Sequence, residues 1–438
     1  MSTVGTEKVD RFLTIHLGLI ALSAAVFWTA HYFVAPAVDL VERVSWKASD
    51  EPWVATGQES LEPLVGVHYF GDLLTLRGWG MVWNPYSDLL ALPGQHLPTG
   101  QLSLMLLAAI PSQILLIFYL VFSVAILFLA IRTLANSILR VSFWKYTQLF
   151  LVFSVLSIPM LVDLDRGNVQ SVALAGTIFF FAYGLRGKWV VAILWLLFAA
   201  SLKPYLLIFS IAFLSKRNFR THALMGVAFC SLNVLLMQAF SGNFLEGFRS
   251  MWEANARYTS SEFSLPFISN AGSLVGSAHR ISEFAFGLEF SNKLLLEVLW
   301  VVPIISFLLV VLGMLIWYRS HLPIWVRLMG ALSIITLAQP GSAAYNWGWV
   351  GVVVIVFLLD KMGRMPLNTA DWSIWYLQVV AALALVPTWV SLPSLSGDIR
   401  QNMSYLILSP IVFAGLVYWA ARSYRKSKNV ESALELET

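Results

Sequence analysis

The chain has little charge for its length. Charged residues fill 12% of its 438 positions and hydrophobic residues fill 58%, whereas a soluble domain usually carries about 25% charged residues. So little charge cannot cover a surface that faces water. Soluble cores also stop growing at roughly 250–300 residues, which leaves no place to bury the apolar excess. The composition excludes an ordinary soluble protein and indicates lipid as the main solvent.

Cysteine is almost absent as well. Cys230 is the single cysteine, which excludes an intramolecular disulfide and any site that needs two thiols. The sequence also has no glycine-rich phosphate loop, no HExxH motif and no internal repeat of six spans. The missing repeat argues against a secondary transporter, because many transporters are built from internal repeats.

What the sequence does have is a series of long apolar runs. A helix needs about 20 apolar residues to cross a bilayer, and the run from Gln101 to Ile131 exceeds that length. We interpret the first run as a retained span, since it is longer than the apolar core of a signal peptide, about 7–15 residues. The runs predict an all-α polytopic membrane protein. We expect about twelve transmembrane helices, near residues 12–34, 102–131, 146–162, 169–185, 189–202, 204–214, 222–240, 294–317, 324–338, 347–359, 373–392 and 403–420.

Basic residues alternate between the loops. One set of short loops and both chain ends hold 18 of the 28 lysines and arginines, so the positive-inside rule places this set in the cytoplasm. The opposite face carries most of the acids and two long loops, 35–101 and 241–293. Their aromatic content predicts partial helices on the outer membrane surface rather than disorder. We expect one membrane domain over 1–438, with a cytoplasmic tail at 421–438.

A break at Lys203-Pro204 separates two apolar segments that are each too short to span upright. A hairpin that turns at this point agrees with the charge rule, and Pro204 disfavours helix at Lys203. Irregular backbone at membrane depth is tolerated only where it is buried in protein or lines a cavity. We therefore expect an outward-facing cavity near Lys203, whose natural partner is a phosphate or a carboxylate. Snorkelling of Lys203 to the interface is the alternative.

Several polar residues of the outer face are candidates for chemistry. Asp72 lies among aromatic residues of the first outer loop, where a carboxylate can act as a general base or simply cap a helix. Asp163 and Asp165 could hold a divalent ion or form a tight polar turn with an internal ion pair. Two weaker polar sets could bind a sugar through amides and hydroxyls: Asn270, Ser273, His279 and Arg280, and Gln339, Ser342, Tyr345 and Asn346.

The stretch from Arg166 to Phe209 resembles the bacterial membrane glycosyltransferases of family 87. Those proteins show Gly followed by Asn or Gln at the start of a span, then a short basic turn, then Lys-Pro-Tyr in an apolar run. Gly71-Asp72 before Asn84-Pro85-Tyr86 looks like the acidic outer loop of the family, and the resemblance covers roughly residues 12–360. The matching motifs in the first stretch are Gly167-Asn168, Arg186-Gly187-Lys188 and Lys203-Pro204-Tyr205, and Asn270 to Leu274 looks like the Asn-x-Ser-Leu segment.

Two motifs depart from the family pattern. Ala343 stands where a late outer loop usually has Trp, and Tyr345 and Asn346 stand where it usually has His. Residues 96–99, His-Leu-Pro-Thr, replace the usual Tyr-Pro-Pro. These differences concern the acceptor and the details of the mechanism.

The resemblance implies a GT-C-like fold and transfer of a mannose-like hexose from a polyprenyl-phosphate donor to a lipid or glycan acceptor. It implies an active site on the outer face of a bacterial plasma membrane, and it gives the role of general base to Asp72. Asp39, which lies closer to the first span, is our second candidate for the base. No cofactor and no nucleic-acid partner are expected, and a metal at Asp163 and Asp165 is optional. We assign the donor phosphate to Lys203, Arg166 and Tyr205, and other substrate contacts to Asp165, Asn168, Asn270, His279, Tyr345 and Asn346.

Two other functions stay open. A polysaccharide polymerase or ligase would use outer-loop arginines such as Arg249, Arg257 and Arg280. A multi-span transporter of sugars or lipid-linked glycans would fit the number of spans, but it would be expected to have repeats and polar residues near the midplane.

Overall fold

The computed structural model divides into two compact units. The described elements of unit 1 lie in Phe143–Pro159 and Ser261–Thr438. Those of unit 2 lie in Ala24–Ser142 and Met160–Ser260. The structure describes residues 71–86, 96–139, 142–157, 159–160, 163–164, 167–210, 218–262, 274, 302–317, 322–338, 347–363, 372–385, 389–394 and 397–437.

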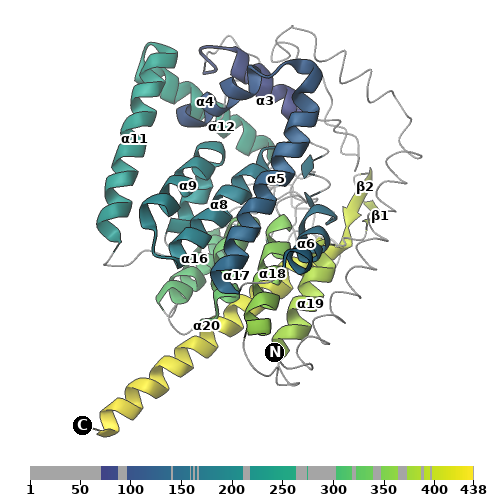
Figure 1. The fold of residues 1–438 in the computed structure, drawn as a ribbon, viewed down its shortest axis with the longest axis vertical. Coiled ribbons are helices and arrows are strands. Elements are labelled where there is room, and N and C mark those ends of the chain that lie inside the picture. Colours follow the sequence, from purple (N-terminus) through teal and green to yellow (C-terminus); the bar gives the residue numbers. More distant parts are fainter. Residues whose placement is uncertain are drawn as a thin grey trace. The chain divides into compact units, whose positions relative to one another are not determined.

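Unit 2 is built around the helix α8, Gln170–Leu185, which is buried along nearly all of its length. Helix α8 packs between α5, Ser112–Ile138, and α9, Trp189–Leu202. Gly176 allows α9 to come close, since a Cβ there would lie 3.0 Å from the Cβ of Ala199. Phe179 of α8 stacks on Trp195 of α9 with ring centroids 4.3 Å apart. These contacts make α5, α8 and α9 the core of the unit (Figure 1).

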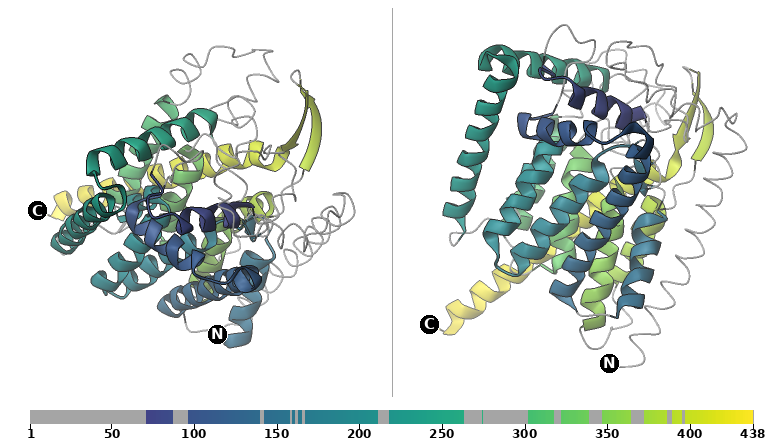
Figure 2. Two further views of the ribbon diagram at one scale, coloured as in Figure 1. Left: turned by 90° about the horizontal axis from the view of Figure 1, so that it is seen from above. Right: turned by 45° about the horizontal axis from the view of Figure 1, so that its top comes forward.

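One end of unit 2 is covered by three further helices, α3, α4 and α12 (Figures 1 and 2). Tyr86, Met237, Phe240 and Met251 form an apolar cluster that joins the residues after α3 to α11 and α12. Gly242, with a φ of +74°, ends α11 and lets the chain turn sharply into α12. The bounds are Gly71–Met81 for α3, Pro98–Ala108 for α4, Phe219–Ser241 for α11 and Phe244–Glu262 for α12.

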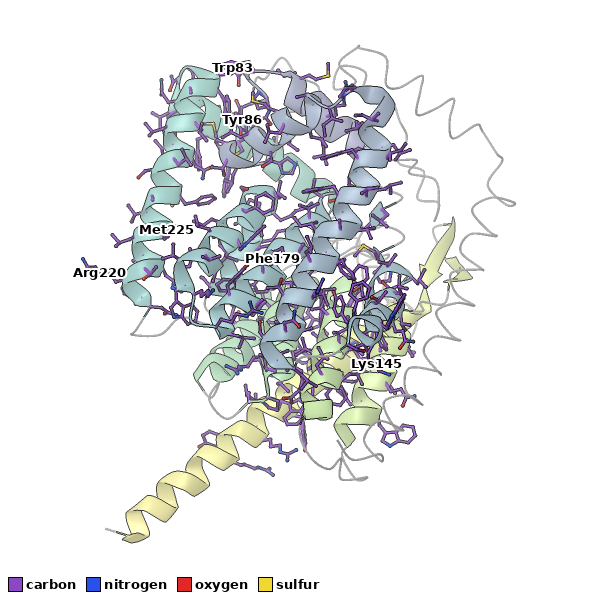
Figure 3. All side chains as sticks on the ribbon, viewed as in Figure 1. Trp83, Tyr86, Lys145, Phe179, Arg220 and Met225 are labelled. Carbon is purple, nitrogen blue, oxygen red and sulfur yellow. The ribbon has the colours of Figure 1, made fainter. Side chains whose placement is uncertain are left out.

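The other end of unit 2 is basic. Arg186, which follows α8, donates from Nη2 to the carbonyl of Thr133 and from Nε to Oγ of Ser137, both at 2.9 Å. Lys188 follows two residues later. Arg220 lies in the first turn of α11, far from Trp83 and Tyr86 (Figure 3). The described part of unit 2 therefore carries Arg186, Lys188 and Arg220 at the end opposite to α3, α4 and α12.

Unit 1 packs around α18, Trp349–Gly363, whose described side chains are almost all buried. Gly351 of α18 leaves no room for a side chain, because a Cβ there would collide with the carbonyl of Phe153. Trp325 is fully buried with its ring against Phe357 and Trp419. The other elements are α6 Phe143–Phe150, the π-helical η3 Leu151–Val155, α16 Val302–Trp317, α17 Ile324–Ala338, α19 Trp372–Leu385, the antiparallel strands β1 Trp389–Ser394 and β2 Gly397–Asn402, and α20 Met403–Glu437.

Several predicted helices need correction. The segment 102–131 is two helices, because α4 ends at Ala108 and α5 begins at Ser112 after Pro111, which disfavours helix in the residue before it. The segment 204–214 begins as a 3₁₀ helix, Pro204–Phe209. In the predicted segment 373–392, helix α19 ends at Leu385 and residues 389–392 belong to strand β1, part of one short hairpin in a described chain that is otherwise helical. Pro387 between them disfavours a longer helix.

Three predicted helices are confirmed. The segments 169–185 and 189–202 match α8 and α9, and 324–338 matches α17.

The number of transmembrane helices is a separate question. Within the described ranges, two helices are long and apolar enough to cross a membrane, Ile114–Ile138 and Phe219–Ser241, and six shorter apolar helices have 10–17 residues. Twelve transmembrane helices are therefore not confirmed. The first predicted span, 12–34, lies outside the described residues.

Candidate functional site

The first turn of α3 lies directly against the turn that precedes α8. Gly167 in that turn has a φ of +70°, and a Cβ there would lie 2.5 Å from the Cβ of Leu73. Only glycine takes up this conformation and this contact without strain. Leu73 follows Asp72 in α3. The contact therefore brings the backbone of Asp72 next to Gly167, although the two are far apart in sequence.

Asp163 and Asn168, which precede α8, are held by buried hydrogen bonds. Asp163 is 1% exposed, and its Oδ2 accepts a 2.9 Å hydrogen bond from the backbone N–H of Ser171 in the first turn of α8. A carboxylate at this place satisfies a free N–H group and complements the positive helix end. The hydroxyl of Tyr119 donates to the carbonyl of Asn168 at 2.8 Å. Asp163 thus caps α8, and this bond would compete with metal binding.

Lys203 stands where α9 ends. Its backbone is extended, with φ −138° and ψ 93°, and its carbonyl accepts from the N–H of Leu206, which lies in the 3₁₀ helix η4. Lys203 is half-buried. Tyr205 is more exposed, and its hydroxyl donates to Oε1 of Gln170 at 3.2 Å. Gln170 is the first residue of α8, so this bond ties the Lys203 turn to the turn that contains Gly167.

His96 holds the same end of α9 from the other side. Its Nδ1 donates to the carbonyl of Leu202 at 3.0 Å, which requires the proton on Nδ1 in the neutral ring. Burial, and then the nearby charge of Lys203, lower the pKa of His96 to about 4, while the bond to Leu202 acts in the opposite direction. His96 is therefore neutral at pH 7. The Tyr86 hydroxyl donates to the carbonyl of His96 at 2.9 Å, and burial raises the pKa of that hydroxyl.

Helix α4 closes the arrangement. Gly100 packs against the carbonyl of Ser201 in α9, and Gly80 of α3 packs against the carbonyl of Leu104. The amide of Gln101, only 1% exposed, donates to the carbonyl of Val82 at 3.4 Å. Contacts thus run from α3 to the Gly167 turn, to the start of α8, to Lys203–Tyr205, to His96–Gln101 and back to α3. We call this closed set of elements the contact ring.

The ring unites candidates from separate parts of the sequence. Asp72, Asn168, Lys203 and Tyr205 belong to it. Among the described residues, no three side chains of His, Cys, Asp or Glu gather as a metal site. The predicted site residues that lie outside the described residues are Asp165, Arg166, Asn270, His279, Tyr345 and Asn346.

Some residues of the contact ring, or bonded to it, are not singled out by the sequence. His96 stands out only as a departure from a family motif. Gln170 of the ring, and Tyr119 of α5, which bonds to Asn168, give no signal because their bonds reach distant segments. Our sequence-based predictions also do not include Arg77 of α3. Its side chain is 9% exposed, and among the described residues its Nε has no hydrogen-bond acceptor. The available signal is an arginine in a short segment that is mostly apolar apart from Asp72 and Thr75.

Comparison with known proteins identifies a family. The model of glycosyltransferase family 87 matches residues 97–340, which is more than half of the chain. The match includes Lys203 and the whole turn before α8, while Asp72 lies before it. No curated protein and no solved structure matches the chain. On the strength of the family match, the chain belongs to glycosyltransferase family 87 and is a glycosyltransferase.

Proposed function

We propose that the enzyme transfers a hexose, mannose-like in class, from a polyprenyl-phosphate donor to a hydroxyl of a lipid or glycan acceptor. The observation that carries this proposal is the contact of Gly167 with Leu73. This contact places the first turn of α3, which contains Asp72, beside the turn that leads into α8. Gln170, the first residue of α8, accepts a hydrogen bond from Tyr205, which is close to Lys203 in sequence. A carboxylate at this end of the unit can remove a proton from the acceptor hydroxyl, and a cation at the same end can stabilise the phosphate that leaves.

The proposed reaction has one bond-making and one bond-breaking event. The acceptor oxygen forms a bond to the anomeric carbon of the sugar while its proton passes to the carboxylate of Asp72. The bond from the anomeric carbon to the phosphate oxygen breaks, and its electrons stay with the lipid phosphate. The leaving phosphate gains one negative charge, which Lys203 is suited to stabilise. Assistance by a metal is optional, since the leaving phosphate is already stable as an anion.

The charges of unit 2 support an outer-face site. Arg186, Lys188 and Arg220 lie at the end opposite to the contact ring, and the positive-inside rule assigns such an end to the cytoplasm. Helix α9 has 14 residues and is about 21 Å long, less than the roughly 30 Å of the hydrocarbon layer. With its basic start at the inner interface, its Lys203 end would lie in the outer half of the layer, within reach of a lipid phosphate.

The remaining predicted roles follow from this arrangement. Arg166 directly precedes Gly167 and would join Lys203 at the phosphate, whereas the hydroxyl of Tyr205 would have to exchange its bond to Gln170 for one to the donor. Asn168 is 8% exposed, so its contribution would be to hold the turn or to meet substrate that enters the ring. The proposed location is a bacterial plasma membrane with both chain ends in the cytoplasm.

A donor-class assay tests the proposal. Purified full-length protein in lipid nanodiscs would be given labelled hexoses on polyprenyl phosphate and, in parallel, the same hexoses on nucleotide diphosphates. We expect transfer to an acceptor lipid extract from the polyprenyl-phosphate series alone. Transfer from a nucleotide sugar without added polyprenyl phosphate would contradict the proposed donor, although the protein would still be a glycosyltransferase.

A further inference from the structure

Arg77 is a cation buried in the short helix α3. Its side chain is 9% exposed, and among the described residues its Nε meets no acceptor. Two other arginines of unit 2 behave differently: Nε of Arg186 donates to Ser137, and Nε of Arg249 donates to Glu253 at 2.8 Å. A guanidinium stays charged at any physiological pH and offers five donors. Burying a guanidinium without an anion destabilises a protein, and a bound anionic ligand would offset that cost.

The position of Arg77 points to the contact ring. Leu73, which touches Gly167, lies one helical turn before Arg77 on the same face of α3. Gly80, which touches α4, lies about one turn after it. Arg77 therefore sits between the two contacts that fix α3 in the ring, and its Cα is only about 6 Å along the helix axis from Leu73.

We propose that Arg77 binds the phosphate of the lipid donor and stabilises it as it leaves, as a further cation beside Lys203 and Arg166. This inference rests on the proposed function. The planar fork of an arginine can hold two phosphate oxygens at once, which fixes the orientation of the group as well as its charge. Lysine acts as a point charge and leaves the phosphate free to rotate. Arg77 thus orients the phosphate on the side of the ring that carries Asp72.

A binding comparison tests Arg77 without relying on turnover. The probes are a polyprenyl phosphate and the polyprenol of equal chain length, titrated into full-length protein in nanodiscs. We expect wild type to prefer the phosphate by about tenfold or more. Arg77→Met, which keeps the volume and removes the charge, should reduce this preference to below about threefold. Arg249→Met on α12, which removes an exposed arginine outside the ring, should keep the wild-type preference.

Thermal unfolding separates a ligand-binding role from a structural one. Removing a buried unpaired charge should leave the ligand-free melting temperature unchanged or raise it. If Arg77→Met does not fold, Arg77→Gln, which keeps hydrogen-bond donors without the charge, gives the same comparison. A variant that keeps the full preference for phosphate, or that melts lower while it keeps that preference, overturns the role of Arg77 and leaves the proposed donor standing. A wild type with no preference for phosphate overturns both.

Discussion

Two glycines with the same backbone conformation differ in what a side chain would meet. Gly167 has φ +70° and Gly187 has φ +72°, yet a Cβ at Gly167 would lie 2.5 Å from the Cβ of Leu73, whereas a Cβ at Gly187 would meet nothing within 4 Å. Both Gly→Ala changes impose the same left-handed strain. Only Gly167→Ala also pushes α3, and with it Asp72, away from the turn. The pair isolates the contact on which the proposed site depends.

The magnitudes follow from these distances. An alanine in the left-handed region costs about 1–2 kcal/mol at either position. Carbon atoms in contact prefer about 3.5–4.0 Å, so α3 must move by roughly 1 Å to accommodate the methyl group that Gly167→Ala adds. A shift of that size in a catalytic group can cost about 100-fold in rate, or about 2.7 kcal/mol of barrier. Gly187→Ala should cost stability alone.

The assay is sugar transfer from a polyprenyl-phosphate donor, with thermal unfolding of each variant as the measure of stability. We expect Gly167→Ala to lower kcat/KM by about 100-fold and Gly187→Ala to change it less than about twofold. The assay temperature must lie below the melting temperature of both variants. Equal kinetic effects of the two changes would refute the idea that the Gly167 turn positions α3.

Three further predictions test other parts of the ring and the orientation. Lys203→Ala should fold and yet bind polyprenyl phosphate about tenfold or more weakly, because it removes a charge that pairs with the phosphate; wild-type binding by this variant would make Lys203 a snorkelling residue only. The pKa of His96 is lowered from 6.5 to about 4, so the folded protein resists its protonation and should lose stability as the pH falls from 6.5 to 4. His96→Gln, whose amide can still donate to the carbonyl of Leu202, should lose less stability between pH 6.5 and pH 4. An identical pH profile of wild type and His96→Gln would contradict the burial of the His96 imidazole. In a Cys230→Ala background, cysteines at Ser60 and Ser260 should react with an impermeant thiol reagent from outside and one at Ser215 should not; the reverse pattern would invert the topology.

The parts of the fold that the sequence predicts are those with local causes. Helices α8 and α9 follow from unbroken apolar runs, separated by a basic turn with Gly187. The break after Leu202 follows from Pro204, which acts on the residue directly before it. The GT-C-like architecture stays a prediction, because no solved structure matches the chain.

The parts that the sequence does not predict depend on distant partners. Nothing near His96 indicates that its ring bonds to Leu202, 106 residues away. The division of 102–131 into α4 and α5 is hidden because apolar residues continue across Pro111. Strand β1 resembles the end of a helix in sequence, since a short apolar run fits either structure. Burial of Arg77 likewise becomes visible only when α3 packs on α4 and the Gly167 turn.

The most direct test of the account is the turnover of Asp72→Asn. The change keeps the shape of the side chain and removes the base, so the variant should bind the donor as wild type does and turn over about 100-fold more slowly or worse. Glu246→Gln on α12, an exposed acid outside the contact ring, is the matched control and should keep wild-type turnover. Near-normal turnover by Asp72→Asn, together with an inactive Asp39→Asn, would contradict the account and move the base to Asp39.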